Sequence, residues 1–320
     1  MILPIFHSYL FLTTLSTVPL IMAMSPTSST PLLKIKLYLI RHSETISNSQ
    51  NLVLGQTDSP LTDKGHKQGQ ATGMALSNVK FHKMYTSDLR RARITANYII
   101  ERNASYDEEG KRLIDASSVD LFQDVRLREK AKGVREGRLK TLSIEDALDV
   151  FRAEQRASAV ALSTPLLETD DQVWDRFVDW TNDLVDGIML DLPDYPRRGT
   201  INGSCSGLSR HTAHGDNEAD VVNIMAVSHS GTIRIILNRL FGADGVGKIV
   251  EREDVWQHTS TRIGEKMDVP NTSITIIEVT PKICNAVTGN DTWGARDSMN
   301  WIAKLSKLTC IDHLQGLDLD

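Results

Sequence analysis

Cysteine is scarce in this chain of 320 residues. The three that occur are Cys205, Cys284 and Cys310, and they form neither a metal-site spacing nor an even set for disulfides. We therefore expect free thiols in a reducing compartment. The chain also lacks an internal repeat, which argues against a repeat architecture.

An excess of positive charge is absent as well. The formal net charge is -5 and the isoelectric point is near 6.0, which argues against a general nucleic-acid binder. The hydrophobic share of 40% and the charged share of 24% are ordinary for a soluble globular protein. Local cations, and not the overall charge, would have to attract an anionic ligand.

The segment 1–33 contains no Lys, Arg, Asp or Glu, and residues 8–24 are mostly apolar. Such a segment can be a secretory signal or a membrane anchor. The positive region that precedes a signal core is missing, however, and Pro19 weakens a membrane-spanning helix. Met22 or Met24 could also be the true start. We expect a cytoplasmic protein, with a signal or anchor at residues 1–24 as the alternative.

Two short apolar runs each end in a histidine. Residues 36–42 read Lys-Leu-Tyr-Leu-Ile-Arg-His, and residues 224–229 read Ile-Met-Ala-Val-Ser-His. Both runs are typical of buried strands. Because ligands of an open α/β sheet bind at the carboxyl ends of its strands, we expect His42 and His229 to share one pocket, with Arg41 beside them.

An ordered series of motifs follows the first histidine. Residues 41–48 read Arg-His-Ser-Glu-Thr-Ile-Ser-Asn, residues 55–65 read Gly-Gln-Thr-Asp-Ser-Pro-Leu-Thr-Asp-Lys-Gly, and residues 86–96 read Thr-Ser-Asp-Leu-Arg-Arg-Ala-Arg-Ile-Thr-Ala. In this order they resemble the histidine phosphatase superfamily, in its phosphoglycerate-mutase-like branch. The resemblance implies an α/β fold: a three-layer sandwich with a mostly parallel central sheet and helices on both faces.

The residue types suit phosphoryl transfer. A neutral imidazole can attack phosphorus and carry the phosphoryl group as a covalent intermediate, a role that we expect for His42. Guanidinium groups are always charged and can grip two phosphate oxygens, which fits Arg41 and Arg91. Asn48 could add a neutral donor. The resemblance further implies that Gln56 faces the substrate.

Serine replaces the family's glycine after each histidine, at Ser43 and Ser230. Since glycine permits close approach of backbone to ligand, we expect a slightly altered phosphate cradle, with Ser230 as one of its residues. Gly231 and Thr232 then begin a helix whose free amides could bind an anion.

A proton donor for the leaving oxygen is expected in residues 126–137, which read Arg-Leu-Arg-Glu-Lys-Ala-Lys-Gly-Val-Arg-Glu-Gly. The segment resembles the family's acid-bearing segment, so that Glu129 is implied as the general acid and later base. Glu136 is the alternative, which we interpret as structural. Glu168 lies either near the phosphate or at a helix N-terminus, where it would complement the dipole.

We expect an N-terminal segment and linker at 1–33 and one catalytic domain over 34–320, with insertions near 138–167 and 191–220. Polarity predicts a surface loop at 103–118, and His211 and His214 are a chance pair and not a metal site. The last forty residues are read as amphipathic and loop-like. Patterning predicts strands near 36–40, 81–86, 119–125, 224–229 and 273–279, and helices near 64–77 (with Thr62 as N-cap), 88–101, 143–160, 168–188 and 231–241.

The resemblance implies a phosphatase that acts on a small phosphorylated metabolite, without metal or other cofactor. The membrane is not an expected partner unless residues 1–24 form an anchor. Two alternatives stay open. One is a mutase of the phosphoglycerate type, which returns the phosphoryl group to another hydroxyl. The other is an inactive, phosphate-binding relative.

Overall fold

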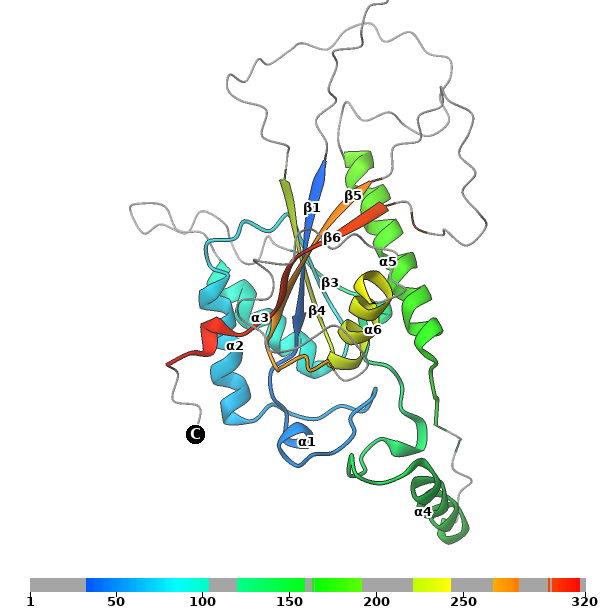
Figure 1. The fold of residues 1–320 in the computed structure, drawn as a ribbon. Helices are drawn as coiled ribbons and strands as arrows, with labels where there is room; N and C mark the ends of the chain where they lie inside the picture. The colour runs from blue at the N-terminus through cyan, green and yellow to red at the C-terminus, as the bar shows by residue number, and fades with distance from the viewer. Residues whose placement is uncertain are drawn as a thin grey trace, which may run out of the picture.

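The computed structural model describes residues 33–103, 120–158, 163, 165–191, 221–242, 267–281, 299 and 301–316. Predictions for the N-terminal segment, for most of 103–118 and 191–220, and for His211 and His214 fall outside these residues. The described part forms three layers, with a sheet between two groups of helices (Figure 1). The predicted sandwich is therefore confirmed.

The sheet has six strands in the order β3-β2-β4-β1-β5-β6. The strands β3, β2, β4 and β1 run parallel, whereas β5 and β6 join antiparallel at one edge. Their bounds are β1 Lys34–Arg41, β2 Lys83–Thr86, β3 Leu121–Gln123, β4 Val221–Ser228, β5 Ile274–Pro281 and β6 Trp301–Cys310. In the register of β1 and β4, Arg41 lies opposite Ser228, so the two strand-end histidines follow at the same level.

Alternation along β1 divides the core between the two faces of the sheet. Leu37 and Leu39 pack with α5 (Asp170–Asp191) and α6 (Ser230–Phe241). Tyr38 and Ile40 pack with α2 (Asp63–Ala75) and α3 (Arg90–Asn103). Successive side chains of a strand point to opposite faces, so a fully apolar strand needs a helix layer on each side.

Local capping explains where the helices begin. The side chain of Thr62 accepts a hydrogen bond from the amide of Gly65, which confirms it as the N-cap of α2. Ser143 caps α4 (Ile144–Ala157) in the same way through Asp146. The short helix α1 (Ile46–Ser49) begins with a capping box between Thr45 and Asn48. The remaining predicted elements are found within a few residues of their expected bounds.

The loop-like reading of the last forty residues is wrong for residues 301–310, which form the edge strand β6. Trp301, Ala303 and Leu305 are buried, while Ile302 is exposed and Lys304 partly so. Lysines on the outward face are common on edge strands because they discourage pairing with another chain.

Helix α4 belongs to the insertion predicted near 138–167 and stands apart from the three layers (Figure 1). Its sequence is amphipathic, yet Ala147 is its only buried residue. It is held by contacts to the 3-10 turn η2 (Gly133–Arg135).

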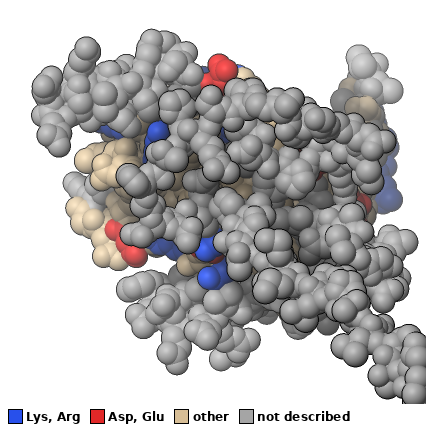
Figure 2. Space-filling model, turned by 90° about the horizontal axis from the view of Figure 1, so that it is seen from above, with Lys and Arg blue, Asp and Glu red and all other residues tan. Residues whose placement is uncertain are grey.

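Acidic and basic side chains both reach the described surface that is visible from above (Figure 2). Among the described helices, none is both long enough and apolar enough to span a membrane.

Trp301 provides a test of β6. Its side chain is fully buried, and its indole Nε1–H donates to Asn182 Oδ1 at 3.0 Å. We expect Trp301→Ala to lower the free energy of unfolding by about 3–5 kcal/mol, since a large core side chain is lost. Ile302→Ala, on the exposed side of the same strand, should cost less than about 1 kcal/mol. Equal losses in urea unfolding would show that β6 does not contribute to the core.

Candidate active site

His42 and His229 lie together at the carboxyl ends of β1 and β4. Their ring centroids are 5.1 Å apart, and both side chains are buried. The amide of His42 donates to Ser228 O at 3.0 Å, which ties the two strand ends together. The structure thus brings the two histidines together, as expected from the ends of the two strands.

The His42 ring has a defined tautomer. Its Nδ1 lies 2.7 Å from the carbonyl oxygen of Ser43, which can only accept, so Nδ1 carries the proton and Nε2 the lone pair. The pKa of His42 is held well below its ordinary value, first by burial and then by the neighbouring Arg91 and Arg41 guanidinium groups. A neutral imidazole with a free Nε2 is a competent nucleophile.

Arg41 approaches the histidines from the end of β1. Its Nη1–H donates to Val269 O at 2.6 Å, whereas its Nε–H is buried without a protein partner among the described residues. Burial lowers the pKa of Arg41 to about 10, so the group stays cationic at neutral pH. Its unpaired Nε–H is free to bind an anion.

Arg91 is fixed from α3 and is 1% exposed. Its Nη1–H donates to Thr57 O and its Nη2–H to Gly55 O, both at 2.7 Å. Its Nε–H is also buried without a partner in the described part of the chain. The two carbonyls thus set the orientation of the guanidinium plane.

Unpaired polar atoms converge on this pocket. Both ring nitrogens of His229 are buried with no protein partner within the described ranges, as are the Nε atoms of Arg41 and Arg91. Burial, followed by Arg91 and His42, keeps the pKa of His229 well below its ordinary value. Most buried polar groups are paired, so such a cluster points to a ligand with acceptor oxygens. Phosphate fits, because it offers oxygens to both guanidinium groups.

Glu129 lies at the beginning of α6. Its carboxylate accepts from the amides of Gly231 at 2.9 Å, Thr232 at 3.1 Å and Lys130 at 2.8 Å. A Cβ on Gly231 would come within 2.3 Å of Glu129 Oε1, so only glycine permits this approach. The amides of Gly231 and Thr232, which we expected to bind an anion, therefore donate to this carboxylate.

Gln56 and Glu168 support the Glu129 segment. The Gln56 Nε2–H₂ group donates to Glu129 O at 3.2 Å and to Glu168 Oε2 at 3.3 Å. Glu168 also accepts from the amide of Ala131 at 2.7 Å and from Arg176 Nε at 3.1 Å. Glu168 lies just before α5, at the helix N-terminus as one of the two alternatives placed it, and it also anchors the segment that carries Glu129.

Asn48 and Ser230 have less direct roles in the structure. Asn48 Oδ1 accepts from the amide of Thr45 at 3.2 Å, within the cap of α1. Its side-chain nitrogen, the donor that the prediction requires, has no hydrogen-bond partner in the described part of the chain. Ser230 is the first residue of α6, directly after His229.

Glu136 is structural, as interpreted from the sequence. Its carboxylate accepts from the amides of Gln56, Thr57 and Lys132, and from the Thr57 hydroxyl at 2.7 Å. Gly55 has φ +53°, and a Cβ there would lie 2.0 Å from Glu136 Oε1. The carbonyls of this 55–57 loop bind Arg91 while its amides bind Glu136, so the loop is fixed from both sides.

The serine at position 43 bonds within the protein. Its amide donates to Thr95 Oγ1 at 2.9 Å, and the two hydroxyls are 3.2 Å apart. The side chain is fully buried beside α3. This contact explains how the chain accommodates serine where the resembling family has glycine.

Asn271 was missed as a site residue. Its Nδ2–H₂ group donates to His42 O at 2.9 Å and lies 3.4 Å from Asn48 Oδ1. No group of three or more His, Cys, Asp or Glu that could hold a metal occurs in the part of the chain that the structure describes.

Known proteins match the region that builds this site. Residues 37–187 match the histidine phosphatase superfamily (branch 1). The chain is 39% identical over 106 residues to fructose-2,6-bisphosphatase TIGAR of Xenopus tropicalis, an alignment that covers 33% of this chain and 35% of that protein. It is 29% identical over 223 residues to the protein of the same name from Bos taurus, covering 64% and 76%. The alignment with the frog protein thus spans about a third of that relative.

The fold has a solved counterpart. A phosphoglycerate mutase from Bacillus anthracis aligns with a TM-score of 0.51 and 18% identity, covering 89% of this chain and 96% of that one. At this identity the likeness bears on the fold alone. The match over residues 37–187 confirms the resemblance to the histidine phosphatase superfamily that the motifs indicated, and the solved structure confirms the fold.

Proposed function

We propose that the protein is a phosphatase that hydrolyses a small phosphorylated metabolite through a phosphohistidine at His42. The observation that carries the proposal is the lone pair of His42 Nε2 beside two buried guanidinium groups, each with an unpaired Nε–H. A nucleophile and a phosphate clamp are thus in one pocket.

The residues divide the reaction into two steps. His42 Nε2 attacks phosphorus, and the leaving oxygen takes a proton from Glu129. Water then attacks the phosphohistidine, and Glu129 takes a proton from this water. Arg41, Arg91 and His229 stabilise the transferring oxygens, with smaller contributions from Asn48, Gln56 and Ser230.

The relatives support a metabolite as substrate, since two of them are named fructose-2,6-bisphosphatase. We propose one catalytic domain over 34–320, with the insertions near 138–167 and 191–220, and no nucleic-acid partner. The guanidinium groups supply positive charge at the phosphate, so we expect activity to persist in EDTA.

We also propose a cytoplasmic location. Cys310, the cysteine that the structure describes, is a buried free thiol, as suits a reducing compartment. Expression of the full chain should give material in the cytosolic fraction that does not shift on endoglycosidase treatment. Glycosylated protein in the secretory pathway would contradict this location, and the segment 1–24 would then act as a signal or anchor.

The nucleophile is tested by His42→Ala. We expect kcat for p-nitrophenyl phosphate to fall at least about 10³-fold, because loss of a covalent nucleophile has effects of this size. His66→Ala is the control, since His66 lies on α2 and contacts Tyr98 instead of the site. Wild-type protein quenched with excess substrate should carry phosphate on His42.

Free phosphate distinguishes the alternatives. A hydrolase releases phosphate in proportion to the ester consumed. Isomerised 3-phosphoglycerate without free phosphate, in the presence of a bisphosphate primer, would favour the mutase. A wild-type protein as inactive as His42→Ala would favour the phosphate-binding relative and contradict the proposal.

The buried histidine pair predicts a pH dependence of stability. Burial holds the pKa of His42 and of His229 well below the unfolded value of about 6.5, so the unfolded chain gains protons first as the pH falls. We therefore expect the free energy of unfolding to decrease from pH 7 to pH 5, by up to about 1.4 kcal/mol per pH unit for each histidine. Urea unfolding at several pH values measures this slope.

The double variant His42→Asn/His229→Asn is the comparison. His313, whose pKa is lowered to about 4 by burial, contributes in the same direction and is retained in both proteins. The variant should have the smaller slope. Equal slopes would mean that the pair is not neutral and buried in the folded protein.

A further inference from the structure

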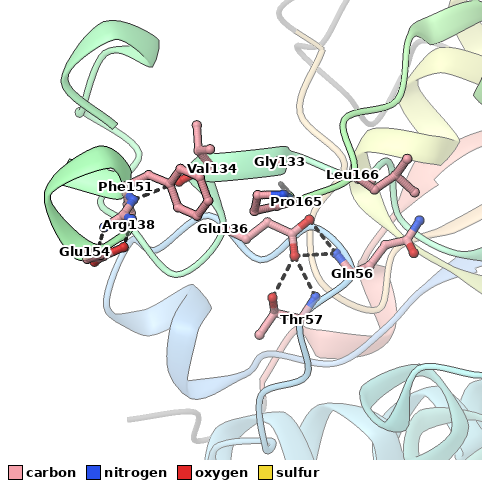
Figure 3. Close-up of a pocket in the computed structure, with 11 residues that line it drawn as sticks. Gln56, Thr57, Gly133, Val134, Glu136, Arg138, Phe151, Glu154, Pro165 and Leu166 are labelled. Atoms are coloured by element: carbon pink, nitrogen blue, oxygen red, sulfur yellow. Dashed lines mark hydrogen bonds and ion pairs between the residues drawn. The ribbon is translucent and has the colours of Figure 1, made fainter. Parts of the chain in front are cut away.

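A cavity of about 480 Å³ lies beside helix α4 (Figure 3). This volume falls within the range of small-molecule pockets, about 300–1,000 Å³. One wall comes from the segments that support the catalytic residues, the other from the insertion near 138–167. It is lined by Gln56, Thr57, Ala131, Gly133, Val134, Glu136, Arg138, Phe151, Glu154, Pro165 and Leu166.

The first wall is shared with the candidate active site. Gln56 lines the cavity and donates from its side chain to Glu129 O. Thr57 lines it as well, and its carbonyl accepts from Arg91 Nη1. Two lining residues of the cavity are therefore bonded directly to the segment of the proposed acid and to the phosphate clamp.

The second wall is built by α4. Phe151 and Glu154 are three residues apart, so they share one face of the helix, and both are directed to the cavity in Figure 3. Arg138 donates from both Nη groups to the Glu154 carboxylate, at 3.2 Å and 2.8 Å. This two-bond pair attaches α4 to the segment that follows Glu136.

The charges of the lining do not suit a second phosphate. Arg138 contributes +1 and Glu136 and Glu154 contribute −1 each, which gives +1 − 2 = −1. The single lining cation, Arg138, is already paired with Glu154. Glu136 is satisfied by amides and a hydroxyl. An anion entering here would meet net repulsion and no unpaired cation from the lining.

The lining instead offers apolar surface with polar groups at intervals. Val134, Pro165, Leu166 and the ring of Phe151 are apolar, and Leu166 is 64% exposed. The Gln56 side chain and the Arg138–Glu154 pair can hydrogen-bond to hydroxyls. Mixed linings of this kind bind neutral organic groups.

We propose that this cavity holds the organic part of the substrate, and that this part is uncharged, with apolar surface and hydroxyls. The inference rests on the proposed phosphatase function and deepens it: the substrate is a phosphate monoester of a neutral alcohol. Two relatives are named bisphosphatases. This chain should prefer a monophosphate to a bisphosphate of the same sugar.

Phe151→Ala tests the apolar contact. We expect KM for p-nitrophenyl phosphate to rise about 5- to 10-fold, as a partly buried ring loses its contact with the substrate. KM for methyl phosphate, which has almost no organic part, should change less than about twofold, since the phosphate contacts are intact. An equal change for both esters, or none for either, would overturn the proposal.

Glu154→Gln tests the charge without removing the side chain. The lining charge changes from −1 to 0 and Arg138 loses its carboxylate partner, so kcat/KM for fructose 1,6-bisphosphate should rise about tenfold relative to fructose 6-phosphate. Asp149→Asn is the matched control. It removes a carboxylate from another arginine pair on α4, with Arg152, that does not line the cavity. It should leave the ratio unchanged.

The outcomes separate the two proposals. Wild type that hydrolyses methyl phosphate, with loss of this activity in His42→Ala, supports the phosphatase whatever the cavity variants do. If Glu154→Gln and Asp149→Asn then shift the substrate ratio equally, or if wild type prefers the bisphosphate, the cavity proposal fails alone. A wild type that hydrolyses no ester contradicts both.

Discussion

The burial of guanidinium groups beside neutral imidazoles is the constraint on which the site depends. Transfer of a cation out of water is costly unless hydrogen bonds replace the lost hydration. Backbone carbonyls provide this for Arg41, through Val269, and for Arg91, through Gly55 and Thr57. Carbonyls solvate a cation without neutralising it, so the positive charge stays available to a phosphate. A carboxylate pressed fully against either guanidinium would have satisfied the cation and weakened the clamp.

Of the carboxylates near this clamp, only the half-exposed Asp58 forms an ion pair with it in the described part of the chain, 3.6 Å from Arg91 Nη1. Glu136 and Glu129 are bound by other donors. The Glu136 carboxylate accepts hydrogen bonds from the amides of Gln56 and Thr57. Arg91 donates to the carbonyl of Thr57 in the same loop. Glu129 is held by amides at the beginning of α6, where the helix dipole favours negative charge. Both groups are thus fixed by backbone, and the loops that carry them must keep one conformation. Glycine at 55 and 231 is required because a Cβ would occupy the space of each carboxylate.

Much of this could be predicted from sequence because it follows from strand order. A parallel pairing of two strands that each end in histidine places His42 and His229 together, whatever the loops do. The uses of Gln56, Glu168 and Asn271 could not be predicted in this way. Each bonds to a segment distant in sequence, and the sequence around a polar side chain does not indicate which distant group it will bond to. Strand β6 was missed for a different reason: it has few β-branched residues, and its pairing with β5 becomes irregular beyond Leu305.

Helix α4 stands apart from the three layers of the fold, and little of its surface is buried. A helix with a strong apolar side that buries only Ala147 gains little from packing, and isolated helices of this length are marginal in water. Its Ser143 cap and the Arg138–Glu154 pair are therefore disproportionately important for its position. Of its apolar side chains, Phe151 lines the cavity, whereas Ile144 and Val150 are exposed. Because so little of α4 is buried in the core, its contacts with η2 and the Arg138–Glu154 pair must fix the position at which it forms one wall of the cavity.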